Sequence, residues 1–198
     1  MNVFGIASNL SVFLVRAGST DLDDQGRIVG SLDMPLSPAG EAEARQTAID
    51  LQEADFDVIV SAHCLAAQQT AQQLSRNSEI RVRVEEGWLN LNHGLWHGKS
   101  LEELKETQPK LYRHWRENPE TVCPPGGETV EEVRIRVSNS LKKIHRKFQG
   151  GTIAIVAPEP LLSIIRAEID DSTVRDPIQP NCGEKRWEEI EMRTKAIA

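Results

Sequence analysis

The side chains that could do chemistry in this sequence stand where apolar, strand-like runs end. Arg16 closes one such run, His63 stands shortly after a second, and Glu159 shortly after a third. A guanidinium binds anions, while imidazole and carboxyl groups move protons or attack electrophiles. If the runs are neighbouring parallel strands, their carboxyl ends meet at one edge of a sheet, where ligands bind in such folds.

Two further histidines, His93 and His97, are four residues apart, a spacing that could serve a metal on a helix. A glycine follows each of them, which argues against a helix, and no carboxylate spacing completes a ligand set. His63 is next to Cys64, but adjacent residues rarely orient as nucleophile and base. We expect no metal and no cofactor, with Cys64 as a small core residue.

The elements that must position these groups alternate between strand and helix. Strands are expected at 11–16, 56–60, 80–84, 152–157 and 187–192, and helices at 38–54, 65–74, 101–115, 128–148 and 161–169. This order predicts an α/β fold, a three-layer α/β/α sandwich whose central sheet is mainly parallel with helices on both faces. The length of 198 residues favours a single domain, 1–198.

Five ordered motifs then resemble one family. LVRAGST at 14–20 is similar to the LVRHGET signature of the histidine phosphatase superfamily, the phosphoglycerate mutase-like proteins. Similar segments follow in the family's order: GRIVGSLDMPLS at 26–37, SAHCLAAQQTA at 61–71, LNHGLWHG at 91–98 and PPGGE at 124–128. A further match, at 153–162, aligns with the strand that in the family ends in a histidine. The resemblance covers about 11–165 and implies a phosphoglycerate mutase-like fold.

The same resemblance implies a mechanism whose groups are missing. The family uses a nucleophilic histidine, a second histidine, two arginines and a carboxylic acid. The matching positions hold Ala17 for the nucleophile, Ala66 for the second arginine, Asn90 for the acid and Pro158 for the second histidine. No catalytic residue is therefore expected at these degenerate positions.

A remnant pocket is expected in place of the active site. Its residues would be Arg16, Asp23, His63, His93 and Glu159. Arg16 is the surviving cation, and an internal ion pair with Asp23 or Glu159 would stabilise it because an unpaired buried charge is costly. Phosphate binding should then be weak or absent.

Three interpretations of function remain. The first is a catalytically inactive, binding or regulatory pseudoenzyme that takes an unknown small molecule or protein partner. The alternative is a phosphate-ester hydrolase with altered chemistry that uses relocated residues such as His63, His93 or Asp23. The third is a structural subunit, in which Trp187 on a strand at the sheet edge could make a homodimer contact.

The amino-acid composition limits the classes of partner that the chain is expected to bind. The chain has 23 Lys and Arg against 30 Asp and Glu, a net charge of −7, which disfavours nucleic acid and anionic lipid. Three scattered cysteines, Cys64, Cys123 and Cys182, do not suggest a disulfide framework. No signal peptide and no apolar run of membrane-spanning length are visible, so a cytoplasmic protein is expected.

Overall fold

The computed structural model describes residues 9–76, 78–174 and 186–193, and their centre is a five-stranded sheet of order β3-β2-β4-β1-β5. The strands are β1 (Leu10–Arg16), β2 (Val58–Ala62), β3 (Val82–Glu85), β4 (Thr152–Ala157) and β5 (Trp187–Met192). Strands β1 to β4 pair in parallel, and β5 runs antiparallel to β1 at the edge. The carboxyl ends of β1 and β4 are in register, with Arg16 opposite Ala157.

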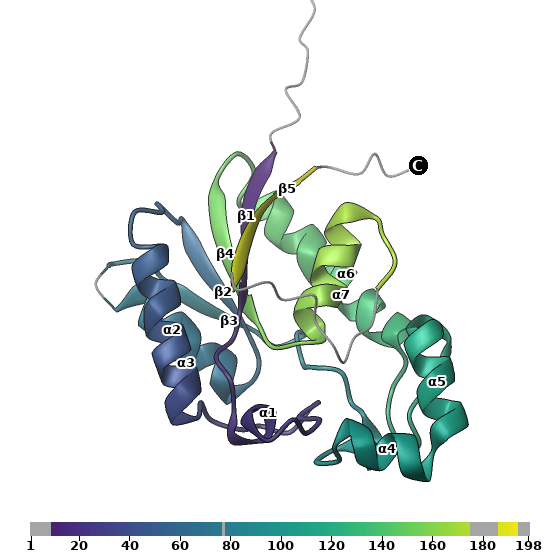
Figure 1. The fold of residues 1–198 in the computed structure, drawn as a ribbon. Coiled ribbons are helices and arrows are strands. Elements are labelled where there is room, and N and C mark those ends of the chain that lie inside the picture. Colours follow the sequence, from purple (N-terminus) through teal and green to yellow (C-terminus); the bar gives the residue numbers. More distant parts are fainter. Residues whose placement is uncertain (1–8, 77, 175–185, 194–198) are drawn as a thin grey trace, which may run out of the picture.

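Helices cover both faces of this sheet (Figure 1). On one face lie α2 (Pro38–Asp50) and α3 (Leu65–Ser75), and on the other α6 (Val130–Lys147) and α7 (Leu161–Asp170). The short α1 (Asp21–Asp24), α4 (Leu101–Thr107) and α5 (Pro109–Glu117) lie beyond the carboxyl ends of the strands. The expected three-layer α/β/α sandwich is confirmed.

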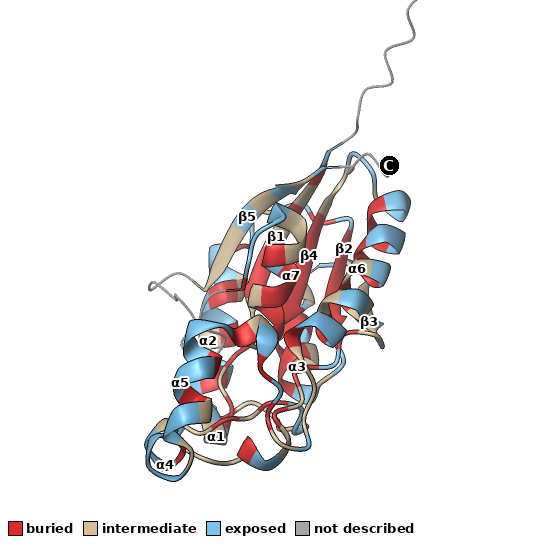
Figure 2. Ribbon diagram, turned by 90° about the vertical axis from the view of Figure 1, so that its right-hand side faces the viewer, coloured by how far each residue is buried: buried red, intermediate tan, exposed pale blue. Residues whose placement is uncertain are grey.

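The core lies where sheet and helices meet, and the buried residues of the sheet run through the middle of the molecule (Figure 2). A second, smaller apolar cluster forms under α4 and α5. It contains Ile28, Trp96, Leu104, Tyr112, Trp115 and Val122. The rings of Trp96 and Trp115 meet edge to face with centroids 5.6 Å apart.

Several expected element bounds need correction. The helix expected at 101–115 is two helices, because Pro109 has no N–H and keeps Gln108 out of helical geometry (φ −138°, ψ 53°). The helix expected to reach Ala54 ends at Asp50. Helix α1 was not expected, since its four residues DLDD carry no apolar periodicity.

None of the helices among the described residues combines the length and apolar character needed to cross a membrane.

Candidate functional site

A small cavity of about 30 Å³ opens at the carboxyl ends of β1 and β4. Its described lining residues are Arg16, Ala17, Gly18, Ser19, Thr20, Asp23, Val29, Gly30, Leu32, Met34, Cys64, Ala66, Asn90, Pro158 and Glu159. The four positions that are expected to be degenerate therefore lie together, with three of the five expected remnant residues. His63 and His93 are not in the lining. All five histidines of the chain are among the described residues, and none lines the cavity.

The loop after β1 reaches the cavity by packing tightly against the start of α2. A Cβ on Gly18 would collide with the backbone of Gly40, and one on Gly40 would collide with that of Ser19. The Gly18 N–H donates to Thr70 Oγ1 at 3.0 Å, and the Ser19 N–H to Glu43 Oε2 at 2.8 Å. These contacts fix the backbone that carries Arg16 and Ala17.

Asp23 faces the cavity but is occupied as a helix cap. Its Oδ2 accepts from the Thr20 N–H at 2.8 Å and from Thr20 Oγ1 at 2.7 Å. Thr20 Oγ1 in turn accepts from the Asp23 N–H, which completes a capping box at the start of α1. The carboxylate therefore holds the turn that leads into α1.

Asn90, which the sequence analysis matched to the family's acid, joins four backbone groups. Its Nδ2 donates to the carbonyls of Gly30 at 3.0 Å and Glu159 at 2.9 Å. Its Oδ1 accepts from the N–H groups of Leu91 at 2.9 Å and Leu161 at 3.2 Å. Both donors and both lone pairs of the amide are used. Asn90 is 4% exposed, so these bonds are shielded from water.

Glu159 is the acid beside the end of β4. Its Oε2 accepts from the Ser163 N–H at 3.1 Å and from Ser163 Oγ at 2.7 Å. Burial raises the pKa of this carboxyl, while the Ser163 bonds and then the charge of Arg16 oppose that rise. Arg16 therefore acts on Glu159 through its charge.

His93 lies outside the cavity, beneath the segment that carries the 3-10 helix Gly94–Trp96. It is 2% exposed, and neither ring nitrogen makes a hydrogen bond of standard geometry. Its ring packs edge to face on Trp115 at 5.9 Å and beside His97 at 6.2 Å. Burial, and then the neighbouring His97, lower the pKa of His93 to about 4, so the ring is neutral at pH 7.

His97 accepts hydrogen bonds from the chain around it. Its Nε2 takes the N–H groups of Ser31 and His93, each at 3.2 Å. His63 is exposed beside the start of α3. No group of three or more potential metal ligands forms within the described part of the chain.

One cavity residue was expected only in the core. Cys64 lines the cavity, and burial raises the pKa of its thiol to about 11, so it is protonated at neutral pH. Its position directly before the helix was the available signal. Cys182 lies outside the described residues.

A comparison with protein families shows which family the chain belongs to. A sequence model of the histidine phosphatase superfamily (branch 1) matches residues 12–196. The chain belongs to that superfamily. It is 30% identical over 148 residues to phosphoserine phosphatase 1 of Hydrogenobacter thermophilus, covering 75% of this chain and 70% of that protein.

Solved structures of related proteins have the same fold as this chain. Bacillus stearothermophilus YhfR superposes with a TM-score of 0.77 at 23% identity, covering 87% of this chain and 85% of that one. A mycobacterial glucosyl-3-phosphoglycerate phosphatase, in a structure with VO3, gives a TM-score of 0.77 at 25% identity and covers 85% of each chain. The mainly parallel sheet and its covering helices are therefore those of phosphoglycerate mutase-like structures.

Proposed function

We propose that this chain is a catalytically inactive member of the superfamily, which acts by binding a small molecule or a protein, a second copy of itself included. The observation that carries the proposal is the lining of the cavity at the carboxyl ends of β1 and β4. The matched positions for nucleophile, second arginine, acid and second histidine present Ala17, Ala66, Asn90 and Pro158 there.

The first support is chemical. A methyl group at Ala17 cannot accept a phosphoryl group, and the Asn90 amide has no proton to give at neutral pH. Pro158 offers neither a side-chain donor nor a backbone N–H. Removal of even one preorganised donor lowers a rate by about 10²–10³. The combined losses leave no covalent route.

The second support is the size of the cavity. Its volume is only about 30 Å³, far below the range of about 300–1,000 Å³ that is usual for small-molecule sites. A phosphate ester is larger than that. Asn90 contributes to the closure, because its four backbone bonds tie the loop at Gly30 to the end of β4.

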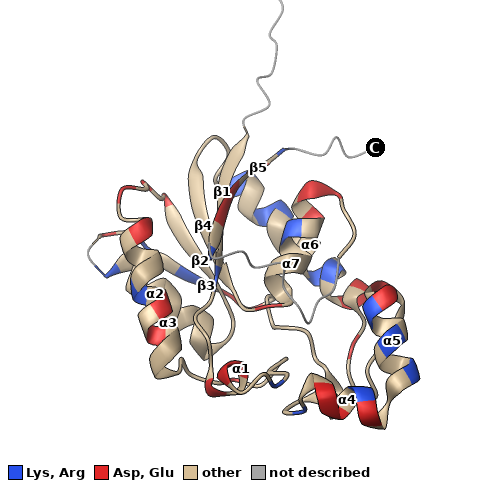
Figure 3. Ribbon diagram, viewed as in Figure 1, with Lys and Arg blue, Asp and Glu red and all other residues tan. Residues whose placement is uncertain are grey.

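The third support is charge. The described lining holds one arginine, Arg16, with the two acids Asp23 and Glu159. Beside it, α1 is almost wholly acidic (Figure 3). A dianionic ester gains little from one guanidinium that already interacts with an acid.

The alternative of altered hydrolase chemistry finds less support. His63 is exposed and outside the lining, while His93 is buried next to the cavity but does not line it. Asp23 does face the cavity, but both hydrogen bonds to its Oδ2 come from Thr20. Neither histidine is in the lining, and the Asp23 carboxylate is already used as a cap, so this alternative has less support than the first.

Hydrolysis of p-nitrophenyl phosphate by the purified protein tests the proposal, with Arg16→Ala as the matched control. We expect equal, background rates from both proteins, because no residue of the cavity supports turnover. Ala17→His should also stay at background, since Ala66 and Pro158 still lack the donors for the transition state. Turnover that Arg16→Ala abolishes, or that Ala17→His creates, would overturn the proposal.

A further inference from the structure

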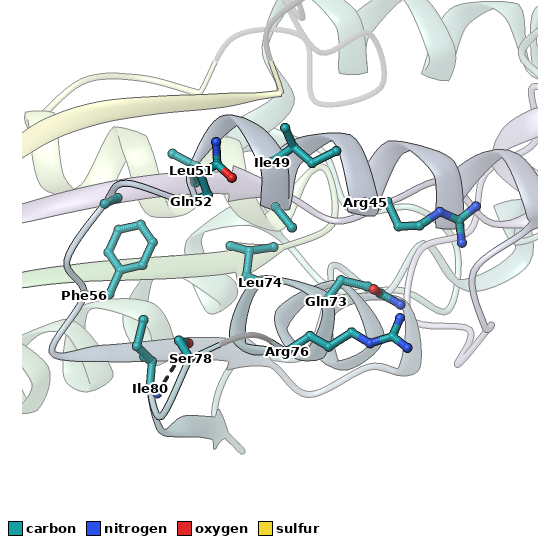
Figure 4. Close-up of a pocket in the computed structure, with 12 residues that line it drawn as sticks. Arg45, Ile49, Leu51, Gln52, Phe56, Gln73, Leu74, Arg76, Ser78 and Ile80 are labelled. Atoms are coloured by element: carbon teal, nitrogen blue, oxygen red, sulfur yellow. Dashed lines mark hydrogen bonds between the residues drawn. The ribbon is translucent and has the colours of Figure 1, made fainter.

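A larger hollow lies between α2 and α3, at the amino ends of β2 and β3. It is therefore at the opposite end of the strands from the small cavity. Its volume is about 500 Å³, within the range of about 300–1,000 Å³ that is usual for small-molecule sites. Its described lining residues are Arg45, Ala48, Ile49, Leu51, Gln52, Ala54, Phe56, Gln73, Leu74, Arg76, Ser78 and Ile80. We call it the α2–α3 groove (Figure 4).

The floor of the α2–α3 groove is apolar and partly open to water. Leu51 and Phe56 are buried beneath it, and Leu74 and Ile80 are half-buried. Ile49 of α2 is 56% exposed, so a large apolar side chain faces solvent at the groove. Burial of such a surface by an apolar ligand is favourable by about 25 cal/mol per Å².

One end of the groove is cationic. The polar ends of Arg45, Gln73 and Arg76 gather there, while Leu51, Leu74, Phe56 and Ile80 lie toward the other end (Figure 4). No hydrogen bond or ion pair joins the Arg76 side chain to the described residues.

The charge of Arg45 is also accessible. Among the described residues it pairs with Glu41 at 3.3 Å, and about half of each side chain is exposed (52% and 55%). Such a surface pair is worth only about 0–1 kcal/mol, so it yields readily to a better anion. In a chain of net charge −7, two accessible guanidinium groups at one end of an apolar groove make a local exception.

The opposite end has the reverse charge. A neighbouring depression shares Phe56 and Ile80 with the groove. Its charged lining residues are the four acids Glu53, Asp55, Asp57 and Glu79 and one cation, Arg81, so acidic groups predominate there. An anionic head group is therefore attracted to the arginine end and repelled from the other, so an elongated ligand has one favoured orientation. The apolar floor is also bounded, which limits the length of the tail.

We propose that the α2–α3 groove binds a single-chain amphiphilic carboxylate of medium chain length. The carboxylate lies between Arg45 and Arg76, since a planar guanidinium matches a carboxylate with two parallel hydrogen bonds. The alkyl chain lies over Ile49, Leu74 and Ile80. This binding site is independent of the proposed loss of phosphatase chemistry.

Calorimetric titration of the full chain with hexanoate, octanoate and decanoate, each below its micelle concentration, tests the proposal. Affinity should rise by about fourfold for each added methylene, which is about 0.8 kcal/mol of apolar burial. Decanol and decyltrimethylammonium should bind at least about tenfold more weakly than decanoate, because they lack the anion. Amide chemical shifts should change at 45–54 and 73–80.

Variants of the two arginines test the contacts of the carboxylate head group. Arg45→Gln with Arg76→Gln should weaken decanoate binding by about tenfold or more, since hydrogen bonds to charged groups are lost. Lys110→Gln with Arg113→Gln, an equal loss of two charges at exposed residues of α5, should leave it unchanged. Three results would overturn the proposal: no binding at millimolar decanoate, equal binding by the double variant, or shift changes confined to the small cavity.

Discussion

The small cavity and the α2–α3 groove lie at opposite ends of the strands, and they differ in how their polar groups are used. At the carboxyl ends of β1 and β4 the cavity is small, and the side chains of Asn90, Asp23 and Glu159 bind neighbouring chain atoms. At the amino ends of β2 and β3 the groove is large, and Arg76 binds none of the described residues. A polar side chain that already binds the surrounding chain is less available to a ligand than an arginine without such a partner. This difference underlies both the proposed function and the proposed groove ligand.

The largest expected effect is on stability at the small cavity. Asn90→Ala leaves two carbonyls and two N–H groups without their partner, and we expect a loss of about 3–4 kcal/mol in the free energy of unfolding. Urea denaturation measures it.

The matched control for this change is Asn118→Ala, the same truncation at an exposed residue, with an expected change within about 0.5 kcal/mol. Equal effects of the two truncations would show that Asn90 does not hold the cavity closed.

The next effect concerns His93, next to the small cavity. Its pKa is about 4 in the folded chain against 6.5 ordinarily, so the unfolded chain binds the extra proton between these values. Stability from this group is complete above about pH 6.5 and falls as the pH drops toward 4, by about 3 kcal/mol in all.

His93→Leu separates this contribution from other acid-titrating groups. The variant should lose less stability than the wild type between pH 7 and pH 4, with no loss at pH 7, because neither ring nitrogen has a standard hydrogen bond to lose. Parallel curves for the two proteins in urea denaturation at each pH would contradict the assignment.

The smallest effect is expected at the groove. Arg76→Gln should change the free energy of unfolding by less than about 0.5 kcal/mol, because the side chain has no partner among the described residues. A thermal melt without ligand measures it. A marked loss of stability would mean that Arg76 does structural work, and the contrast between the two hollows would fail.

Much of the scaffold follows from local patterns. β4 occupies the residues that its short β-branched run TIAIVA predicts, and β5 those that the alternation in WEEIEM predicts. The helices at 101–117 were mispredicted where Pro109 breaks an otherwise continuous apolar period. The four residues of α1 depend on the Thr20 capping box, which a periodicity cannot reveal.

The small cavity and the α2–α3 groove also differ in how far the sequence could predict them. Arg16, Asp23 and Glu159 could be placed at the cavity because strand ends and family motifs converge there. His63 and His93 could not be excluded, since side-chain direction at a loop is set by packing against partners such as Trp115. The α2–α3 groove has no motif at all: it arises from the ends of two helices and the loops that follow them.

Binding of orthovanadate tests the central claim most directly, because it asks whether the cavity accepts a phosphoryl group without requiring turnover. Isothermal calorimetry of the wild type and Arg16→Ala with vanadate gives the answer. We predict no saturable binding to either protein at millimolar vanadate. Binding by the wild type that is lost in Arg16→Ala would contradict the account, since it would show that a phosphoryl site persists around Arg16.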